Sequence, residues 1–211
     1  MANRKIVKIK RSTKYSDRII VYLDDKSVFR IPEDVFVLNP LQVDDQVSIE
    51  TIESYGKKMR LQEAKDAGYR LLGFRMRSIA EMRKRLKEKD FIEDEIDYVV
   101  NQMIDLKYLD DNAFGKAFVR EKVKNKKIGP MALRSDLIPH FLPSDLVNCL
   151  IRDIYTEFDP HELIAAHLKK RGIKREEPLD QKSQKRMNDF LARKGFYWDS
   201  IREVYLEWGL I

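Results

Sequence analysis

Residues 77–111 decide the fold of this chain, and they read RSIAEMRKRLKEKDFIEDEIDYVVNQMIDLKYLDD. Together with the residues just before them, they predict three short amphipathic helices. The apolar residues at helical spacing are Ala64, Ala67, Leu71 and Leu72, then Ile79, Met82 and Leu86, then Ile96, Val99, Val100, Met103 and Ile104. Ser78 and Glu81 form a capping box for the second helix, and Asp94 is placed to cap the third. Helices this short must bury their apolar stripes against one another, which predicts a three-helix bundle.

The same pattern returns further along the chain. A shift of 105 residues brings Met82, Leu86, Lys89, Phe91, Asp94, Ile96 and Val99 onto Met187, Leu191, Lys194, Phe196, Asp199, Ile201 and Val204. A middle copy has Leu133 and Leu137 and then, after a slip of one residue, Phe141, Leu146, Cys149 and Leu150. Its first helix is expected over residues 111–125, and that of the last copy over 159–171. A period of about fifty residues predicts an elongated tandem array of three three-helix repeats.

Before the repeats, the sequence predicts a small antiparallel β unit. Segments 6–9, 18–23, 27–31 and 47–49 are rich in β-branched and aromatic residues, with a turn at 24–26 and one or two helical turns at 33–38. Gly56-Lys57-Lys58 suggests an exposed or mobile joint at 55–61, so the β unit either packs on the first helices or swings on the joint. The predicted division is 1–56, 57–111, 112–158 and 159–211. The chain is mainly α.

Composition narrows the class of protein. In 211 residues there is one cysteine and 36% charged residues, with a mean hydropathy of −0.51. Cys149 occupies a core position of its predicted helix and is expected to be a small buried hydrophobe in a reducing compartment. No apolar run approaches the roughly 20 residues that span a bilayer, and no secretory signal is recognisable. We expect a cytoplasmic protein that does not enter membranes.

The residue pattern does not indicate an enzyme. His140, His161 and His167 are not spaced four apart and do not lie near Cys149, so metal ligation or thiol–imidazole catalysis is unsupported. His167 lies in an apolar helix and is expected to be partly buried. Asp110-Asp111 could be a catalytic carboxylate pair, but helix capping is favoured, as at Asp159. We predict no catalytic residue, no metal and no cofactor.

Positive charge indicates a binding role instead. The net charge is +6 and the pI about 9.2. Basic residues recur in each repeat: Arg75, Arg77, Arg83, Lys84, Arg85, Lys87 and Lys89; then Arg120, Lys122, Lys124, Lys126 and Lys127; then Lys169, Lys170, Arg171, Lys174 and Arg175. Of these we select Arg75, Arg77, Arg83, Lys84, Arg85, Lys87, Arg120, Lys122, Lys124, Lys126 and Lys127 as the candidate contacts. They can neutralise phosphates without reading sequence, or form a solvated face diluted by acids.

Two side-chain groups need a separate interpretation. Arg120 either faces a partner or pairs with Asp110 or Asp111. The aromatic residues Tyr108, Phe114, Phe118, Phe196, Tyr205 and Trp208 fall at core spacing and are expected to be packing residues, whereas Trp198 is left unassigned.

The third helix of each predicted repeat begins with acids, such as Glu93 and Asp94 in the first repeat, and these acids would repel phosphates. A sequence-specific helix-turn-helix protein is therefore not expected.

Several motifs together resemble the RecX family. They are Arg77-Ser78 with Glu81-Met82, then Leu86, Lys89 and Phe91, then Tyr108-Leu109-Asp110-Asp111, Phe114, Phe118-Val119-Arg120 and Gly129-Pro130. The resemblance covers roughly residues 60–211, and the β unit is similar to one that some members carry. The chain departs from the family in the middle repeat, at Asn125-Lys126-Lys127-Ile128-Gly129 and at Pro139-His140-Phe141-Leu142.

This resemblance implies a bacterial regulator of the recombinase RecA. Such a protein would lodge in the groove of the RecA–DNA filament as an inhibitor, and modulate recombination, DNA repair and the SOS response. It would bind single- or double-stranded DNA without sequence specificity. Separately from the resemblance, an array with charged outer faces can be a monomer. The alternative is a stand-alone DNA-binding protein, whose affinity should fall steeply with salt.

Overall fold

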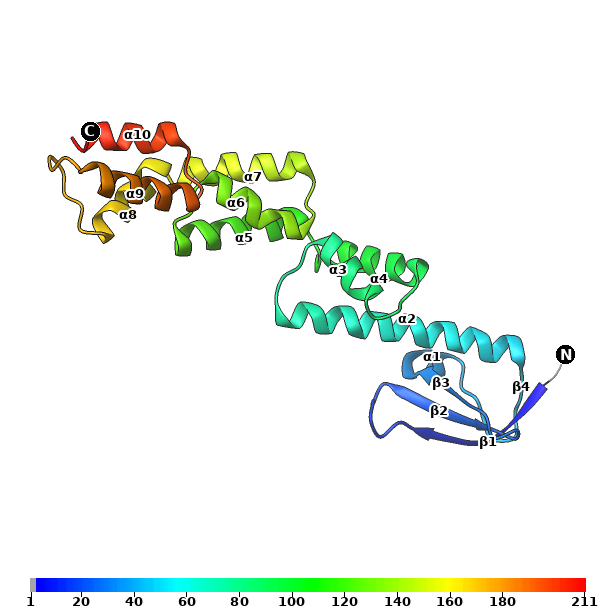
Figure 1. Cartoon of the computed structure of the whole chain (residues 1–211). Coiled ribbons are helices and arrows are strands. Elements are labelled where there is room, and N and C mark those ends of the chain that lie inside the picture. The colour runs from blue at the N-terminus through cyan, green and yellow to red at the C-terminus, as the bar shows by residue number, and fades with distance from the viewer. Residues whose placement is uncertain (1–2) are drawn as a thin grey trace. The chain divides into compact units, whose positions relative to one another are not determined.

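The computed structural model describes residues 3–211, and that part of the chain contains one small sheet and ten α-helices (Figure 1). The elements of the β unit are β1 Asn3–Arg11, β2 Arg18–Leu23, β3 Val28–Pro32, α1 Glu33–Leu38 and β4 Gln46–Ser48. The helices that follow are α2 Ile49–Phe74, α3 Ile79–Lys87, α4 Glu93–Asp105, α5 Asp111–Lys126, α6 Pro130–Leu137, the 3₁₀ turn η1 Ile138–His140, α7 Ser144–Glu157, α8 Pro160–Lys170, α9 Gln181–Arg193 and α10 Trp198–Glu207. The mainly α class is confirmed. Two compact units result, one reaching Arg75 and including Met82–Leu106, the other combining Met76–Glu81 with Lys107–Ile211.

The predicted β unit is confirmed as a four-stranded antiparallel sheet in the order β3-β2-β1-β4. Alternation along β2 sends Ile19, Val21 and Leu23 into a core that also holds Ile6 and Ile31. The turn at 24–26 connects β2 to β3, and Pro32 ends β3 because it lacks the N–H that would continue the ladder.

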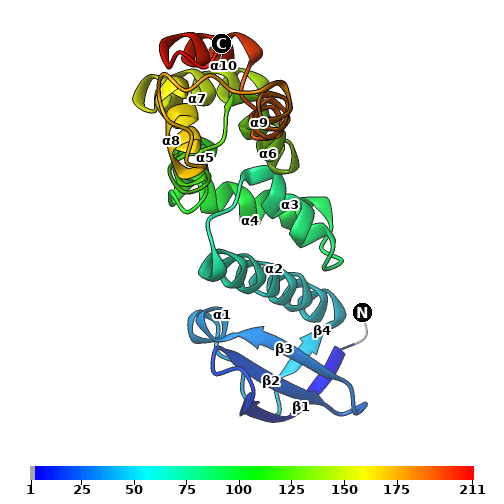
Figure 2. The ribbon, with the colours of Figure 1, turned by 60° about the vertical axis from the view of Figure 1, so that its left-hand side comes forward.

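The joint expected at 55–61 is wrong, because α2 runs unbroken through it. Tyr55 lies in the core of the sheet, and its ring stacks on that of Phe29 with the centroids 5.7 Å apart. Arg18, only 5% exposed, pairs with Asp66 of α2 at 2.7 Å. Burial of these side chains outweighs the roughly 1 kcal/mol that Gly56 costs inside a helix. Of the two alternatives, the β unit packs on α2 (Figure 2).

The first three-helix repeat is built from the second half of α2 with α3 and α4. Its predicted core is confirmed at Ala64, Ala67, Met82, Leu86, Ile96, Val99, Val100 and Met103, all of which are buried. Ser78 Oγ accepts from Glu81 N at 3.1 Å, so the predicted cap of α3 is present. The prediction for Asp94 is wrong, because α4 already begins at Glu93. Glu95 instead accepts a hydrogen bond from Ile92 N at 3.1 Å.

The middle repeat matches the first without the predicted slip. Helix α4 begins at Glu93 and α7 at Ser144, and the preceding turns have left-handed residues at Asp90 (φ 63°) and Phe141 (φ 52°). Leu142, not Phe141, therefore takes the place of Phe91. In this register Leu150, Ile151 and Ile154 are buried. Cys149 lies outside the core, with its Sγ 3.3 Å from a carboxylate oxygen of Asp153.

The last repeat follows its predicted register. Met187, Leu191, Phe196, Ile201 and Val204 are all buried, and Gly195 occupies the left-handed turn position with φ 84°. The repeats α5–α7 and α8–α10 share one continuous apolar core that extends from Phe114 to Leu210. Adjacent helical repeats are stabilised in this way, because each covers the apolar face of the next.

Candidate polyanion-binding surface

Three basic residues of α3 are paired with acids of α4 or of the turn that follows α3. Arg83 pairs with Asp97 and lies 3.4 Å from Glu93, while Lys87 lies 3.2 Å from the same carboxylate. Arg85 pairs with Glu88 at 2.7 Å. These side chains are partly exposed, so each pair contributes only about 0.2–1 kcal/mol. They nevertheless neutralise much of the charge that the sequence assigned to this helix.

Arg77 lies just before α3, and its side chain is largely buried. Its side chain is 9% exposed and its Nη1 lies 2.5 Å from Glu81 Oε1. Next to it, Ser78 Oγ donates to the carbonyl of His140 at 2.7 Å. The His140 ring lies between two aromatic neighbours, 4.6 Å from the ring of Phe118. The side chain of Arg77 is therefore enclosed by protein. Arg75 and Lys84 also have interactions within the described chain.

The two neighbouring carboxylates Asp110 and Asp111 have different roles. Asp110 caps α5 by accepting from the N–H groups of Asn112 and Ala113, and the bond from Ala113 is the largest effect holding its pKa below the ordinary value. Asp111 accepts from Ile79 N at 2.8 Å, and burial raises its pKa. Capping is thus confirmed at Asp110, whereas Asp111 connects α5 to the start of α3.

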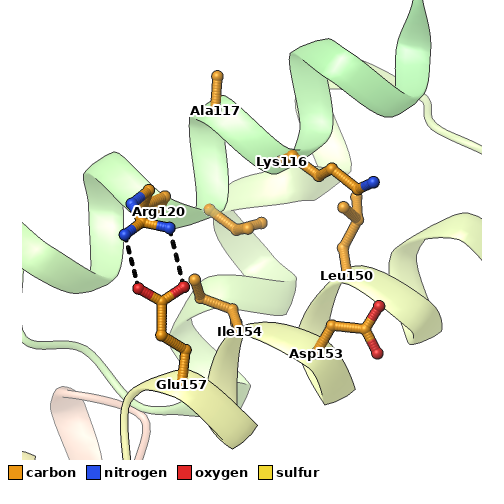
Figure 3. Close-up of a pocket in the computed structure, with 8 residues that line it drawn as sticks. Lys116, Ala117, Arg120, Leu150, Asp153, Ile154 and Glu157 are labelled. Carbon is orange, nitrogen blue, oxygen red and sulfur yellow. Dashed lines mark hydrogen bonds and ion pairs between the residues drawn. The ribbon is translucent and has the colours of Figure 1, made fainter.

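Arg120 does not pair with Asp110 or Asp111, one of the two alternatives expected for it, and whether it also faces a partner stays a prediction. It forms a bidentate pair with Glu157 of α7, with N···O distances of 2.7 and 2.9 Å (Figure 3). The pair borders a shallow pocket between α5 and α7, whose apolar wall includes Leu150 and Ile154. Lys122 is likewise paired, with Asp136 at 2.7 Å. Arg120 and Lys122 are therefore neutralised by carboxylates within the repeat.

The end of α5 is different. Lys124, Lys126 and Lys127 are exposed and form no ion pair within residues 3–211. Lys194 Nζ lies 3.5 Å from the carbonyl of Lys126, and His167 Nε2 lies 2.7 Å from that of Lys127. These contacts place the end of α5 beside α8 and the end of α9.

His167 shows how much positive charge gathers there. As predicted, it is a buried boundary residue, with 7% of its surface exposed. Its pKa is lowered, first by burial and further by the positive charges of Lys194, Lys127 and Lys170, against the raising effect of its bond to the Lys127 carbonyl. Sequence reasoning did not select Lys194 or Lys170 as contacts. Their separation from α5 along the chain gives no signal of this proximity.

Most of the aromatic predictions hold. Phe114, Phe196, Tyr205 and Trp208 are buried, and burial raises the pKa of Tyr205 to about 12. The prediction that Tyr108 is a packing residue of the core is wrong, because 58% of its surface is exposed. In the part of the chain that the structure describes, no three His, Cys, Asp or Glu side chains are arranged to hold a metal ion. Within that same part, every helix is too short or too polar to cross a bilayer.

The fold defines a tandem three-helix-repeat protein with an N-terminal sheet and a group of unpaired lysines. The sequence model described as "RecX, first three-helix domain" matches residues 64–103. A relative from Bacillus subtilis strain 168, named "Regulatory protein RecX", is 30% identical over 93% of this chain and 74% of its own length. Another of that name, from Clostridium botulinum strain Eklund 17B, is 24% identical over 96% of this chain and 95% of its own. The chain belongs to the RecX family.

Solved structures agree on the fold. The crystal structure of a regulatory protein RecX superimposes with a TM-score of 0.69 at 21% identity, covering 95% of this chain and 98% of the other. RecX from Lactobacillus salivarius gives a TM-score of 0.62 at 20% identity, covering 72% of this chain and 98% of the other. The N-terminal sheet and the helical repeats of this chain thus have counterparts among solved structures.

Proposed function

We propose that this protein is a non-enzymatic regulator of the RecA recombinase. It binds in the groove of the RecA–DNA filament and inhibits recombinase activity, and so modulates recombination, DNA repair and the SOS response. Membership of the RecX family over nearly the whole chain carries the proposal, since the relatives that match 93–96% of it are named regulatory proteins. The partner RecA comes from the family resemblance.

The arrangement of charges supports a role that does not depend on DNA sequence. A helix that reads bases must bring basic or amide side chains into the major groove at its N-terminal end. Helix α4 instead begins with Glu93, Asp94 and Glu95. These acids would repel phosphates at the position where a recognition helix enters the groove. The cationic residues therefore serve backbone contacts.

The direct test is RecA-catalysed strand exchange and DNA-dependent ATPase activity with the protein titrated in. Inhibition should develop as the protein approaches stoichiometric amounts relative to RecA. Absence of any effect on either activity at that ratio would refute the proposal.

The second candidate is a stand-alone DNA-binding protein, which the unpaired lysines at the end of α5 favour. Salt separates the two functions, because DNA binding by phosphate contacts weakens steeply with salt. In a pull-down, retention on RecA filaments at a salt concentration that removes the protein from bare DNA supports the regulator. Equal loss from both supports the stand-alone protein.

Other parts of the proposal rest on the sequence alone. The protein acts in the cytoplasm as a monomer, without a cofactor. The division at residues 56, 111 and 158 stays a prediction, as does the contact role of the selected residues: Arg75, Arg77, Arg83, Lys84, Arg85, Lys87, Arg120, Lys122, Lys124, Lys126 and Lys127.

A further inference from the structure

Three helix C-termini meet between the second and third repeats, and each carries lysines. Lys126 and Lys127 end α5, Lys170 ends α8, and Lys194 follows α9. Arg171 comes directly after α8. We call these five side chains the junction cluster. The contacts already described, from Lys194 to the Lys126 carbonyl and from His167 to the Lys127 carbonyl, hold the three helix ends together.

Phe190 and His167 form the floor of the junction cluster. Their ring centroids lie 5.3 Å apart in an edge-to-face arrangement. Arg171 lies over the Phe190 ring, with Cζ 3.8 Å from its centroid, and Lys194 Nζ lies 5.8 Å from the same centroid. The guanidinium of Arg171 is thus held against an aromatic face, which leaves its edge available to a ligand.

The charge of the junction cluster is not balanced by protein. None of its five members forms an ion pair with an acid among residues 3–211. The three helix ends contribute about half a negative charge each, which explains why lysines are tolerated there but offsets less than half of the five positive charges. Burial lowers the pKa of the neighbouring His167, and the positive charges of Lys194, Lys127 and Lys170 lower it further.

We propose that the junction cluster is a binding site for the phosphate backbone of nucleic acid, and this rests on the proposed function. A phosphate chain suits the site better than an acidic protein surface, because lysine is depleted where protein partners meet. Lysine and arginine are the residues that neutralise phosphates and release counterions. The self-paired residues of α3 contribute less to this binding, since Arg83, Arg85 and Lys87 already have carboxylate partners.

The test compares two triple variants that remove the same formal charge. One is Lys126→Gln, Lys170→Gln and Lys194→Gln in the junction cluster. The other is Arg83→Gln, Arg85→Gln and Lys87→Gln on α3. Binding of the full chain to fluorescein-labelled oligothymidylate is followed by fluorescence anisotropy between about 50 and 200 mM salt. Circular dichroism and thermal melting establish that both variants fold.

The junction variant should lose about two units from the slope of log affinity against log salt, because each single-strand phosphate contact contributes about 0.7. At about 0.1 M salt this corresponds to roughly a hundredfold weaker binding. The α3 variant should change the slope by less than about half a unit. Equal losses in the two variants, or an unchanged slope in the junction variant, would overturn the proposal.

RecA strand exchange with the same variants separates the site from the function. A junction variant that has lost DNA binding but still inhibits RecA supports the site and leaves the regulator intact. A wild-type protein that binds DNA through the junction cluster yet has no effect on RecA supports the site and refutes the regulator. A junction variant that keeps DNA binding but loses inhibition overturns the site and indicates a protein contact.

Discussion

Gly129 lies where an added methyl group has no room. A Cβ atom there would be 2.4 Å from the carbonyl oxygen of Gly195 and 2.6 Å from the nitrogen of Phe196. Two hydrogen bonds hold these segments together, from Gly129 N to the Lys194 carbonyl at 2.8 Å and from Met131 N to the Gly195 carbonyl at 3.0 Å. The backbone of Gly129 has φ −88°, which alanine adopts freely, so Gly129→Ala tests mainly the close contact, with a smaller cost from placing alanine at the N-cap of α6.

The expected cost is about 3 kcal/mol of unfolding free energy. Forcing extra volume into a packed contact costs about 1–3 kcal/mol, and each of the two hydrogen bonds contributes about 1 kcal/mol. Alanine also lowers the conformational entropy of the unfolded chain, which offsets about 0.4–1 kcal/mol of this cost. For a chain of this size, about 3 kcal/mol corresponds to a fall in Tm of roughly 6–12 °C.

Tryptophan fluorescence measures the effect in the right place, because Trp198 and Trp208 both lie in the last repeat. Urea unfolding of Gly129→Ala is compared with that of Gly56→Ala, followed by circular dichroism. Gly56 has no neighbouring atom within 4 Å and lies inside α2, so alanine there should stabilise by up to about 1 kcal/mol. A cost below about 0.5 kcal/mol for Gly129→Ala would refute the contact between the two repeats.

Three further predictions concern buried or boundary side chains. Arg18→Met should destabilise the N-terminal unit by about 2 kcal/mol in thermal unfolding followed by circular dichroism, whereas the exposed Arg30→Met should change it by less than about 0.5. Because the pKa of His167 is lowered in the folded protein, its contribution to stability is complete above about pH 6.5 and is lost as pH falls through the folded-state pKa. The variant His167→Gln should therefore weaken the pH dependence of the unfolding free energy, measured with urea between about pH 7 and 5. An unchanged pH dependence would contradict this. Cys149→Ala should lower the unfolding free energy by less than about 0.5 kcal/mol in the same urea assay, whereas Leu150→Ala should lower it by about 2–5 kcal/mol. Equal losses in the two variants would contradict the register of α7.

The cores of the repeats could be predicted from sequence because helical spacing decides which residues are buried. The middle repeat departs from the predicted register at Phe141, whose aromatic side chain resembles Phe91 in sequence. Its left-handed backbone gives no signal, since a bulky residue rarely takes that conformation, unlike the aspartate and glycine at the corresponding turns. Aligning Phe141 with Phe91 shifts the rest of the predicted repeat by one residue and places Cys149 in the core.

The candidate surface was harder to predict because charge pairing depends on how helices approach one another. Arg83 and Asp97 lie on different helices, and nothing within either helix indicates that they meet. The junction cluster has the same origin, since α5, α8 and α9 each contribute lysines to it. Sequence identified where positive charge is concentrated, whereas tertiary packing determines which charges are neutralised.

Helix α2 contributes to two cores, because Tyr55 in its first half is buried in the core of the sheet and Ala64 and Ala67 further along are buried in the first repeat. The rotation between those faces is set only by the number of residues that separate them. Inserting one residue between Tyr55 and Ala64 would turn one face by about 100° relative to the other, whereas inserting seven would turn it by only about 20°. The number of residues between the two faces of α2 therefore fixes their relative orientation, and insertions or deletions there preserve it only when they add or remove nearly whole helical turns.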